Sequence, residues 1–274
     1  RYPEPEIIKA VMDNLGSVRQ ALISSELETA FAHFIREVFT PALDKFDLEK
    51  QKNELDTISE LRPELIYWLA KYGQSSEIIT YAESAARSFM TKPTSVDASI
   101  AKRALQITAL AGDKALFDAY KSHFENAKTP VQRDNYLSAI GYFSSIELQN
   151  EALNYALSGP LNVSELFIIS RGIRVAGDNG RNLVFHWMMD NYDIIISKIP
   201  NEYAGYMPVF AKGCSEERLE KSRQFFAKPG HQAEGTMRNL AKVEDEVNNC
   251  VKLRKREGEA VKTYLNQLVN ITTK

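Results

Sequence analysis

The chain has 274 residues, of which 44% are hydrophobic and 26% are charged, a composition typical of a folded protein rather than of a disordered segment. Its 34 lysines and arginines nearly balance 36 aspartates and glutamates, so it lacks the positive charge that binds phosphate backbones, and we expect no nucleic-acid partner. No uninterrupted apolar run approaches the ~20 residues that cross a bilayer, so we expect no membrane insertion.

Apolar residues recur at helical spacing along almost the whole chain, whereas the period-two alternation of strands is scarce. The chain is therefore predicted to be all-α. In chain order, the predicted helices cover residues 26–46, 60–72, 76–90, 96–111, 114–126, 130–143, 145–157, 163–176, 180–198, 216–227 and 236–268, with a break expected in the last one near Gly258.

Helix starts and stops can be identified from the residues that flank these segments. Thr129 precedes Pro130 and lies three residues before Gln132. This order predicts that the Thr129 hydroxyl caps the helix, that Pro130 lies in the first turn and that the Gln132 side chain reaches back to the cap. Asn162 and Glu165 have the same spacing. Glycines that follow apolar helical stretches predict the stops, namely Gly73, Gly112, Gly159 and Gly177.

Helices joined by turns of a few residues must pack as antiparallel hairpins. The pairs Gly112-Asp113 and Gly177-Asp178 both mark a helix stop followed by a new start, 65 residues apart, which is about two hairpins of a stacked helical repeat. We therefore predict antiparallel helical hairpins stacked as a curved, two-layer α-solenoid, similar to HEAT or armadillo superhelices, with a concave inner face. Residues 1–274 are predicted to form a single domain.

No catalytic or metal-binding motif is found in the sequence. The four histidines do not form His-Glu-x-x-His, and we predict packing or surface roles for His33, His123, His186 and His231. The two cysteines, Cys214 and Cys250, are far apart and form no Cys-x-x-Cys pair, so the sequence suggests neither a structural zinc site nor a disulfide framework. Nucleophile elbows and phosphate-binding loops are also absent from the sequence.

Three arginines form the candidate binding site. Arg171 and Arg174 lie three residues apart on one predicted helix, and Arg181 follows across a Gly-Asp-Asn-Gly turn. Convergent guanidinium groups suit a peptide carboxylate, so these arginines are predicted to hold a substrate tail, although pairing with local acids or solvent is an open alternative. A basic run at residues 252–256 is interpreted as a solvated helix face that is also able to contact an acidic partner.

Aromatic residues of the second half are interpreted as core and rim packing rather than as a ligand box. They are Phe185, Trp187, Tyr192, Tyr203 and Tyr206.

Two segments resemble the C-terminal domain of gluzincin zinc aminopeptidases, a group that includes puromycin-sensitive, endoplasmic-reticulum and aminopeptidase N-like enzymes. They are Phe34-Ile35-Arg36-Glu37-Val38-Phe39-Thr40-Pro41 and Gly180-Arg181-Asn182-Leu183-Val184-Phe185-His186-Trp187-Met188-Met189-Asp190-Asn191-Tyr192. The resemblance continues at Leu61-Arg62, Gly73, Gly112-Asp113, Thr129-Pro130, Phe225-Phe226 and Tyr264-Leu265, and it covers most of residues 20–266. The chain departs from the family pattern at some positions; Leu253, for example, stands where relatives often have tryptophan. Such departures exchange one apolar residue for another.

This resemblance implies a parent protein that is a zinc-dependent aminopeptidase. Its His-Glu-x-x-His motif and its Gly-Ala-Met-Glu-Asn stretch would lie in a preceding thermolysin-like domain, because neither occurs in these residues. The chain itself is then expected to have no catalytic residue, metal ligand or cofactor, with zinc bound in the missing domain. Its partners would be its own N-terminal catalytic domain and peptide substrates, whose entry it would gate by covering the active-site cleft.

Two other interpretations are compatible with the residues. One is a free-standing α-solenoid that binds proteins or peptides, although a start at Arg1 rather than at methionine suggests a piece cut from a longer chain. The other is an inactive relative whose upstream zinc motif is degraded. The sequence upstream of Arg1 distinguishes all three; the compartment, oligomeric state and substrate residue preference are not determined by these residues.

Overall fold

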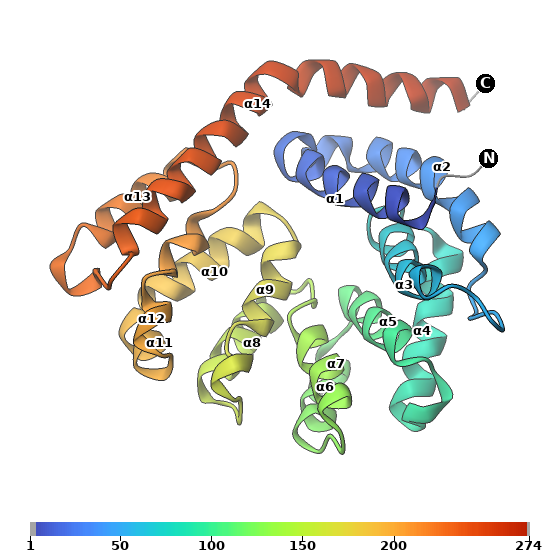
Figure 1. Ribbon diagram of the computed structural model, residues 1–274, viewed down its shortest axis with the longest axis horizontal. Helices are drawn as coiled ribbons and strands as arrows, with labels where there is room; N and C mark the ends of the chain where they lie inside the picture. The colour runs from blue at the N-terminus through green and yellow to red at the C-terminus, as the bar shows by residue number, and fades with distance from the viewer. Residues whose placement is uncertain (1–3, 273–274) are drawn as a thin grey trace. The chain divides into compact units, whose positions relative to one another are not determined.

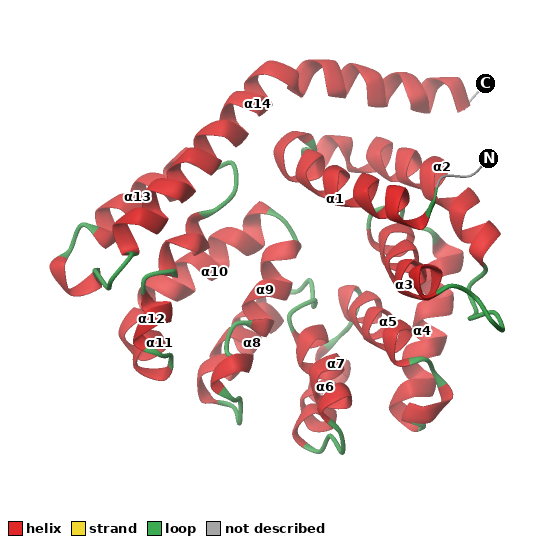
Figure 2. Cartoon of the chain, in the orientation of Figure 1, coloured by secondary structure: helices red, strands yellow, loops and turns green. Residues whose placement is uncertain are grey.

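The structure is a computed structural model that describes residues 4–272. Every regular element in this range is an α-helix or a short 3₁₀ helix, and no strand occurs among the described residues (Figure 2). The all-α class predicted from the sequence is confirmed. Within the same range, no helix combines the length and the apolar character needed to span a bilayer.

The chain divides into two compact units. The first contains the residues up to Ala139 together with those from Glu257 onward, and the second contains Ile140–Arg256. Helical hairpins build each unit, as predicted. The curved superhelix and the single-domain organisation of the whole chain stay predictions.

The first unit begins with seven α-helices, α1 to α7, and Figure 1 shows them from blue to green. Helix α3 contacts α1, α2, α4 and α5, and α4 packs along α5. The elements are α1 (Pro5–Leu22), a 3₁₀ turn (Ser25–Leu27), α2 (Glu28–Phe46), α3 (Asp56–Lys71), α4 (Ser76–Thr91), a 3₁₀ turn (Pro93–Ser95), α5 (Ala98–Leu110), α6 (Lys114–Glu125) and α7 (Pro130–Ile140).

The core of this unit is formed where α2 meets α3. Phe31, Ile35 and Phe39 recur every four residues along α2, so they lie on one face, and all three are buried. Phe39 meets Trp68 of α3 edge to face, with ring centroids 5.7 Å apart. Ile35 and Phe39, which belong to the segment at 34–41 that resembles the aminopeptidase domain, are thus packing residues.

The second unit contains shorter helices. They are α8 (Ile146–Ser158), a 3₁₀ turn (Val163–Glu165), α9 (Ile168–Val175), α10 (Asp178–Asp190), α11 (Tyr192–Lys198), α12 (Asn201–Ala204), a 3₁₀ helix (Met207–Ala211), α13 (Glu216–Phe226), a 3₁₀ turn (Pro229–His231) and the first part of α14 (Thr236–Thr272). Helix α9 packs against α8 and α10, and α10 also contacts the 3₁₀ helix at 207–211 and α13.

Close approach of α9 and α10 depends on Gly180. A Cβ atom at this position would collide with the backbone carbonyl of Ile173, so a glycine is needed where α10 crosses the end of α9. Val184 and Met188 then bury the inner face of α10, one turn apart. The Gly180-Arg181 pair therefore places Arg181 next to the C-terminal end of α9.

Four sequence-based helix boundaries were wrong. Helix α1 was not predicted, although Pro5 occupies its first turn, where a proline is tolerated. The helix predicted at 163–176 is divided into a 3₁₀ turn and α9. The helix predicted at 180–198 is divided at Asn191 into α10 and α11, so each predicted helix consists of two shorter elements. Helix α14 continues through Gly258, because a single glycine costs only about 1 kcal/mol in a helix that has many other bonds.

The predicted helix starts have their caps. The Thr129 hydroxyl accepts a hydrogen bond from the Gln132 amide at 3.2 Å, and the Gln132 side chain accepts from the Lys128 amide at 3.1 Å. Asn162 and Glu165 form a reciprocal capping box, with the Asn162 amide donating to Glu165 Oε2 at 2.8 Å. That box begins a 3₁₀ turn instead of an α-helix, so the signal located a start but not the type of helix.

Candidate functional site

Helices α9 and α10 bring the predicted arginines into one region of the second unit. Arg174, in the last turn of α9, donates from Nη2 to the carbonyl of Val209 at 3.1 Å, and its guanidinium lies 5.4 Å from the centre of the Phe210 ring. Its Nε is buried and has no hydrogen-bond partner among the described residues. Arg171, one turn earlier, is exposed.

Arg181 lies in the first turn of α10 with its side chain only 14% exposed. It donates from Nη1 to Oδ1 of Asp178 at 3.3 Å, so pairing with a local acid, the alternative to a ligand contact, does occur. That carboxylate is itself 44% exposed. Asp178 is therefore positioned between the arginine and solvent.

Two further arginines, which the sequence did not indicate, meet the same carboxylate. Arg218 of α13 is almost fully buried, and its Nη2 lies 3.8 Å from Asp178 Oδ1. Arg254 of α14 is exposed, and its Nη2 lies 3.9 Å from Asp178 Oδ2. No local pattern assigns either residue to this site, because they are 37 and 73 positions from Arg181 along the chain.

Backbone carbonyls hold Arg218 in place. Its Nε donates to Ala211 at 3.3 Å and its Nη2 to Lys212 at 3.0 Å, while Nη1 donates to the side-chain oxygen of Asn182. A buried guanidinium with this many partners has little rotational freedom. It is a fixed positive charge beneath the site.

The charges of several of these arginines act on one another. Burial, together with the charges of Arg181, Arg218 and Arg171, lowers the pKa of Arg174 to about 10. Burial also lowers the pKa of Arg218, against the opposing effect of Asp178. We call Arg171, Arg174, Arg181, Arg218 and Arg254 the arginine cluster.

The chemistry of the arginine cluster is that of an anion site. The guanidinium groups of Arg181, Arg218 and Arg254 lie within 4 Å of Asp178, and the charges of Arg171, Arg181 and Arg218 act on Arg174. Guanidinium forks bind carboxylate and phosphate through paired, charge-assisted hydrogen bonds. The charges of Arg171 and Arg181 act on Arg174 in the structure, and the role of these three arginines toward a substrate tail stays a prediction.

The basic run at 252–256 is partly engaged with this region. Arg254 contacts Asp178, and the Lys255 Nζ lies 3.9 Å from Glu216 Oε1 on α13. Its interpretation as a solvated helix face with local pairing accounts for these contacts.

The two cysteines form a disulfide, a pairing that the sequence left undetermined. Cys214 and Cys250 are 36 residues apart, and the fold brings their Cα atoms to 5.2 Å. This pair is not evident from the sequence, because spacing alone does not show which helices pack together. The disulfide joins the loop before α13 to α14, next to the arginine cluster.

The zinc that the family resemblance implies does not fit the described part of the chain. Among residues 4–272, no three histidine, cysteine, aspartate or glutamate side chains are grouped in a way that would hold a metal ion. His123 instead stacks on Tyr136, with ring centroids 4.8 Å apart, and burial lowers its pKa. His231 stacks on Phe225 at 4.0 Å, a packing role as predicted.

The aromatic residues also take packing positions. Phe185, Trp187 and Tyr192 are buried, whereas Tyr203 and Tyr206 are more than half exposed at the rim of the second unit. The core-and-rim interpretation agrees with this placement.

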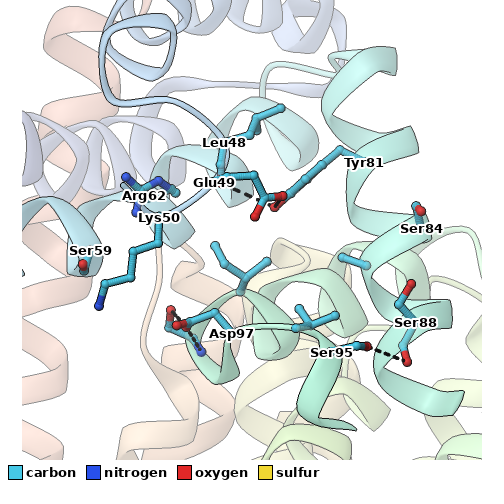
Figure 3. Close-up of a pocket in the computed structure, with 14 residues that line it drawn as sticks. Leu48, Glu49, Lys50, Ser59, Arg62, Tyr81, Ser84, Ser88, Ser95 and Asp97 are labelled. Carbon is cyan, nitrogen blue, oxygen red and sulfur yellow. Dashed lines mark hydrogen bonds between the residues drawn. The ribbon is translucent and has the colours of Figure 1, made fainter. Parts of the chain in front are cut away.

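A separate polar pocket of about 270 Å³ lies in the first unit, between the loop at 47–50 and helices α4 and α5 (Figure 3). Its polar groups bond to neighbouring protein groups. The Tyr81 hydroxyl donates to Glu49 Oε1 at 3.0 Å, and Asp97 accepts from the Ser99 amide at 2.9 Å (Figure 3). Arg62 at its base pairs with Glu54. We assign this pocket no ligand and interpret it as a polar joint between helices.

Comparison with known proteins places the chain in a family. The family model described as "ERAP1-like C-terminal domain" matches residues 3–249. The alanine/arginine aminopeptidase of Saccharomyces cerevisiae is 26% identical over 155 residues, which cover 54% of this chain and 18% of the yeast enzyme. The matched stretch thus corresponds to less than a fifth of that relative. The extent of the family match shows that this chain belongs to the ERAP1-like C-terminal domains of aminopeptidases.

Proposed function

We propose that this chain is the non-catalytic C-terminal domain of a zinc metallo-aminopeptidase, in which it covers the active-site cleft and gates or positions peptide substrates. The family match over residues 3–249 carries this proposal, and the arginine cluster supports it as a site for a negatively charged group. The partner is the N-terminal catalytic domain of the same protein, which would bind the zinc.

The arginine cluster suits the carboxylate at the far end of a peptide substrate. An aminopeptidase binds the amino terminus of a peptide at its catalytic centre, so the opposite end of the peptide carries a free carboxylate. The exposed Arg254 and the partly exposed Arg181 are the groups that would contact it first. Arg174 and Arg218, which are more buried, would contribute a fixed field that favours the anion.

Asp178 would be displaced or shared when a carboxylate binds. Its two oxygens lie 3.3 Å from Arg181, 3.8 Å from Arg218 and 3.9 Å from Arg254, so its contacts with Arg218 and Arg254 are longer than good hydrogen bonds. A substrate carboxylate at hydrogen-bonding distance would therefore replace weak contacts with stronger ones. This exchange gives the site selectivity for long peptides that reach it.

The first test uses the complete reading frame that encodes this chain. The expressed protein should hydrolyse aminoacyl chromogenic substrates and should lose that activity when a chelator removes the metal. Removal of residues 1–274 should then alter the preference between short and long peptides. Unchanged hydrolysis of both by the remaining part would contradict a gating role, and the absence of a zinc motif upstream would instead favour a peptide-binding scaffold.

The second test addresses the arginine cluster in the same complete protein. Arg181→Ala should raise KM for long peptides with a free carboxylate by roughly tenfold, since charge-assisted hydrogen bonds contribute about 1.5–3 kcal/mol. KM for a short aminoacyl amide should stay the same. Arg87→Ala is the matched control, because Arg87 is an exposed arginine of the first unit that pairs weakly with Glu83 at 4.0 Å. An equal effect of Arg181→Ala on both substrates would make this arginine a structural residue.

A further inference from the structure

The loop before α13 supports much of the arginine cluster. The carbonyls of Ala211 and Lys212 accept hydrogen bonds from Arg218, and the carbonyl of Cys214 accepts one from Arg254 at 3.5 Å. Gly213 lies directly against the Arg218 guanidinium and within 3.3 Å of Arg181 Cδ, measured from the position of its missing Cβ. Residues 211–214 are thus the surface on which two arginines are positioned.

Gly213 makes this loop sensitive to its anchors. Its φ of +133° is open to glycine and strained for other residues, so the chain here has a conformation that local preferences do not enforce. Some external constraint must hold such a segment in one conformation, since glycine has the largest conformational freedom in the unfolded or loosened state.

The disulfide supplies that constraint. Cys214 is the last residue of the loop, and its bond to Cys250 attaches the loop covalently to α14. Cys250 and Arg254 lie four residues apart on α14, so they share one face of the helix and approach the loop together. The same crossing of loop and helix therefore contains a disulfide and a guanidinium-to-carbonyl hydrogen bond.

We propose that the Cys214–Cys250 disulfide is a redox-sensitive staple that sets the geometry of the arginine cluster and thereby its affinity for a carboxylate ligand. The carboxylate ligand in this inference rests on the proposed function. The effect of the disulfide on the positions of the arginines does not depend on it. These are the two cysteines of the 274-residue sequence, so a thiol reagent acts on the chain through this pair.

The chemical step is thiol–disulfide exchange with a dithiol reductant. A thiolate of the dithiol attacks one sulfur of the disulfide and forms a mixed disulfide, and the second thiolate of the reductant then closes to a ring disulfide. Two protein thiols form, and the reductant loses two electrons and two protons to them. Cys214 is only 6% exposed, so exchange should begin at the more accessible Cys250.

After reduction, the loop at 211–214 is free to leave α14. Arg218 then loses carbonyl partners at Ala211 and Lys212, and Arg254 loses the Cys214 carbonyl. Mutual repulsion among the arginines favours their separation once these partners are gone. The oxidised chain should consequently bind a carboxylate more tightly than the reduced chain.

The test compares the oxidised and the reduced 274-residue chain by two measurements. The first is the rate at which an arginine-specific dicarbonyl modifies Arg218, measured by mass spectrometry, which should rise several-fold on reduction because this side chain is buried in the oxidised form. The second is binding of a fluorescein-labelled alanine-rich peptide with a free C-terminal carboxylate, against the same peptide as a carboxamide. The preference for the free carboxylate should fall about fivefold on reduction, a typical coupling between linked sites.

The double variant Cys214→Ser/Cys250→Ser is the control, and the reductant should change neither measurement in it. An Arg218 modification rate that is equal in the oxidised and reduced wild type would overturn the staple, as would a response of the double variant. A modification rate that rises while both peptides bind equally in each state would support the staple and contradict the carboxylate function. The two proposals can therefore fail separately.

Discussion

The chain buries arginine in two places, and the two settings are opposite. In the first unit, Arg62 of α3 is 2% exposed and pairs with Glu54, whose side chain is 5% exposed. Arg62 Nη1 donates to Glu54 Oε1 at 2.7 Å, Nε donates to the Asp47 carbonyl at 2.8 Å and Nη2 to the Phe46 carbonyl at 2.9 Å. One positive charge meets one negative charge, and both groups are enclosed.

In the second unit, Arg181, Arg218 and Arg254 lie within 4 Å of Asp178, which is 44% exposed. Charge balance alone does not hold this group together, because the charges of Arg171, Arg181 and Arg218 help to lower the pKa of Arg174. Backbone carbonyls and the Cys214–Cys250 disulfide hold it instead. The comparison indicates that the Arg62–Glu54 pair is structural, whereas the arginine cluster is the site that we propose for a negatively charged ligand.

The largest expected effect comes from breaking the balanced pair. Arg62→Ala leaves the Glu54 carboxylate enclosed without its partner, which should lower the free energy of unfolding by about 3–5 kcal/mol. Urea unfolding at neutral pH measures this change. The double variant Arg62→Met/Glu54→Gln, which removes both charges, should recover most of the loss; a double variant as unstable as Arg62→Ala would contradict the assignment of the cost to an uncompensated charge.

Removal of the disulfide should have the next largest effect. The disulfide restrains the arginine cluster, in which opposite charges do not balance as they do in the Arg62–Glu54 pair. Cys214→Ser/Cys250→Ser should lower the free energy of unfolding by about 2–4 kcal/mol, the usual contribution of a disulfide. The wild type in a dithiol reductant should unfold at the same urea concentration as the variant. If reductant leaves the wild-type midpoint unchanged while the thiols are shown to be free, the disulfide does not stabilise the second unit.

The dependence of the free energy of unfolding on acidic pH should be a smaller effect, and it is specific to Glu54. Hydrogen bonding to Arg62 lowers the pKa of Glu54 from 4.5 to about 2 in the folded chain. A depressed carboxylate pKa stabilises the folded state above the unfolded pKa, and this stabilisation is lost as pH falls from about 4.5 toward 2. Glu54→Gln should therefore be less stable than wild type at neutral pH.

Unfolding curves of wild type and Glu54→Gln at a series of acidic pH values test this expectation. The difference between the two proteins should shrink as pH falls through this range. A difference that stays constant with pH would show that Glu54 contributes through its hydrogen bonds alone and not through its charge.

Much of the fold could be predicted from the sequence because its signals are local. Capping residues such as Thr129 and Asn162 lie within four positions of the amides that they satisfy, and Gly177 precedes α10 with a positive φ of 133°. Helix α1 was not predicted, and Glu4 at its N-cap makes no side-chain capping hydrogen bond that would mark its start. In the arginine cluster, Arg171, Arg174 and Arg181 were found because one hairpin joins them.

The missed part of the site consists of contacts between distant segments. Arg218 reaches the site through α13 packing against α10, and Arg254 and Cys250 reach it through α14. No local pattern encodes which of the acidic or basic residues on those helices faces inward. Packing of whole helices decides it.

The smallest expected effect separates the two arginine settings most clearly. Arg171→Gln removes an exposed charge that repels Arg174, so the free energy of unfolding should stay within about 0.5 kcal/mol of wild type and should shift in the stabilising direction at low salt. Arg87→Gln, which removes an arginine with a carboxylate partner, should shift it by a similar amount in the opposite direction. Added salt should abolish both differences, since screening shortens the range of surface interactions to about 10 Å at 0.1 M. A clear destabilisation by Arg171→Gln that persists in salt would mean that Arg171 is held by packing, and the arginine cluster would then be less repulsive than its geometry indicates.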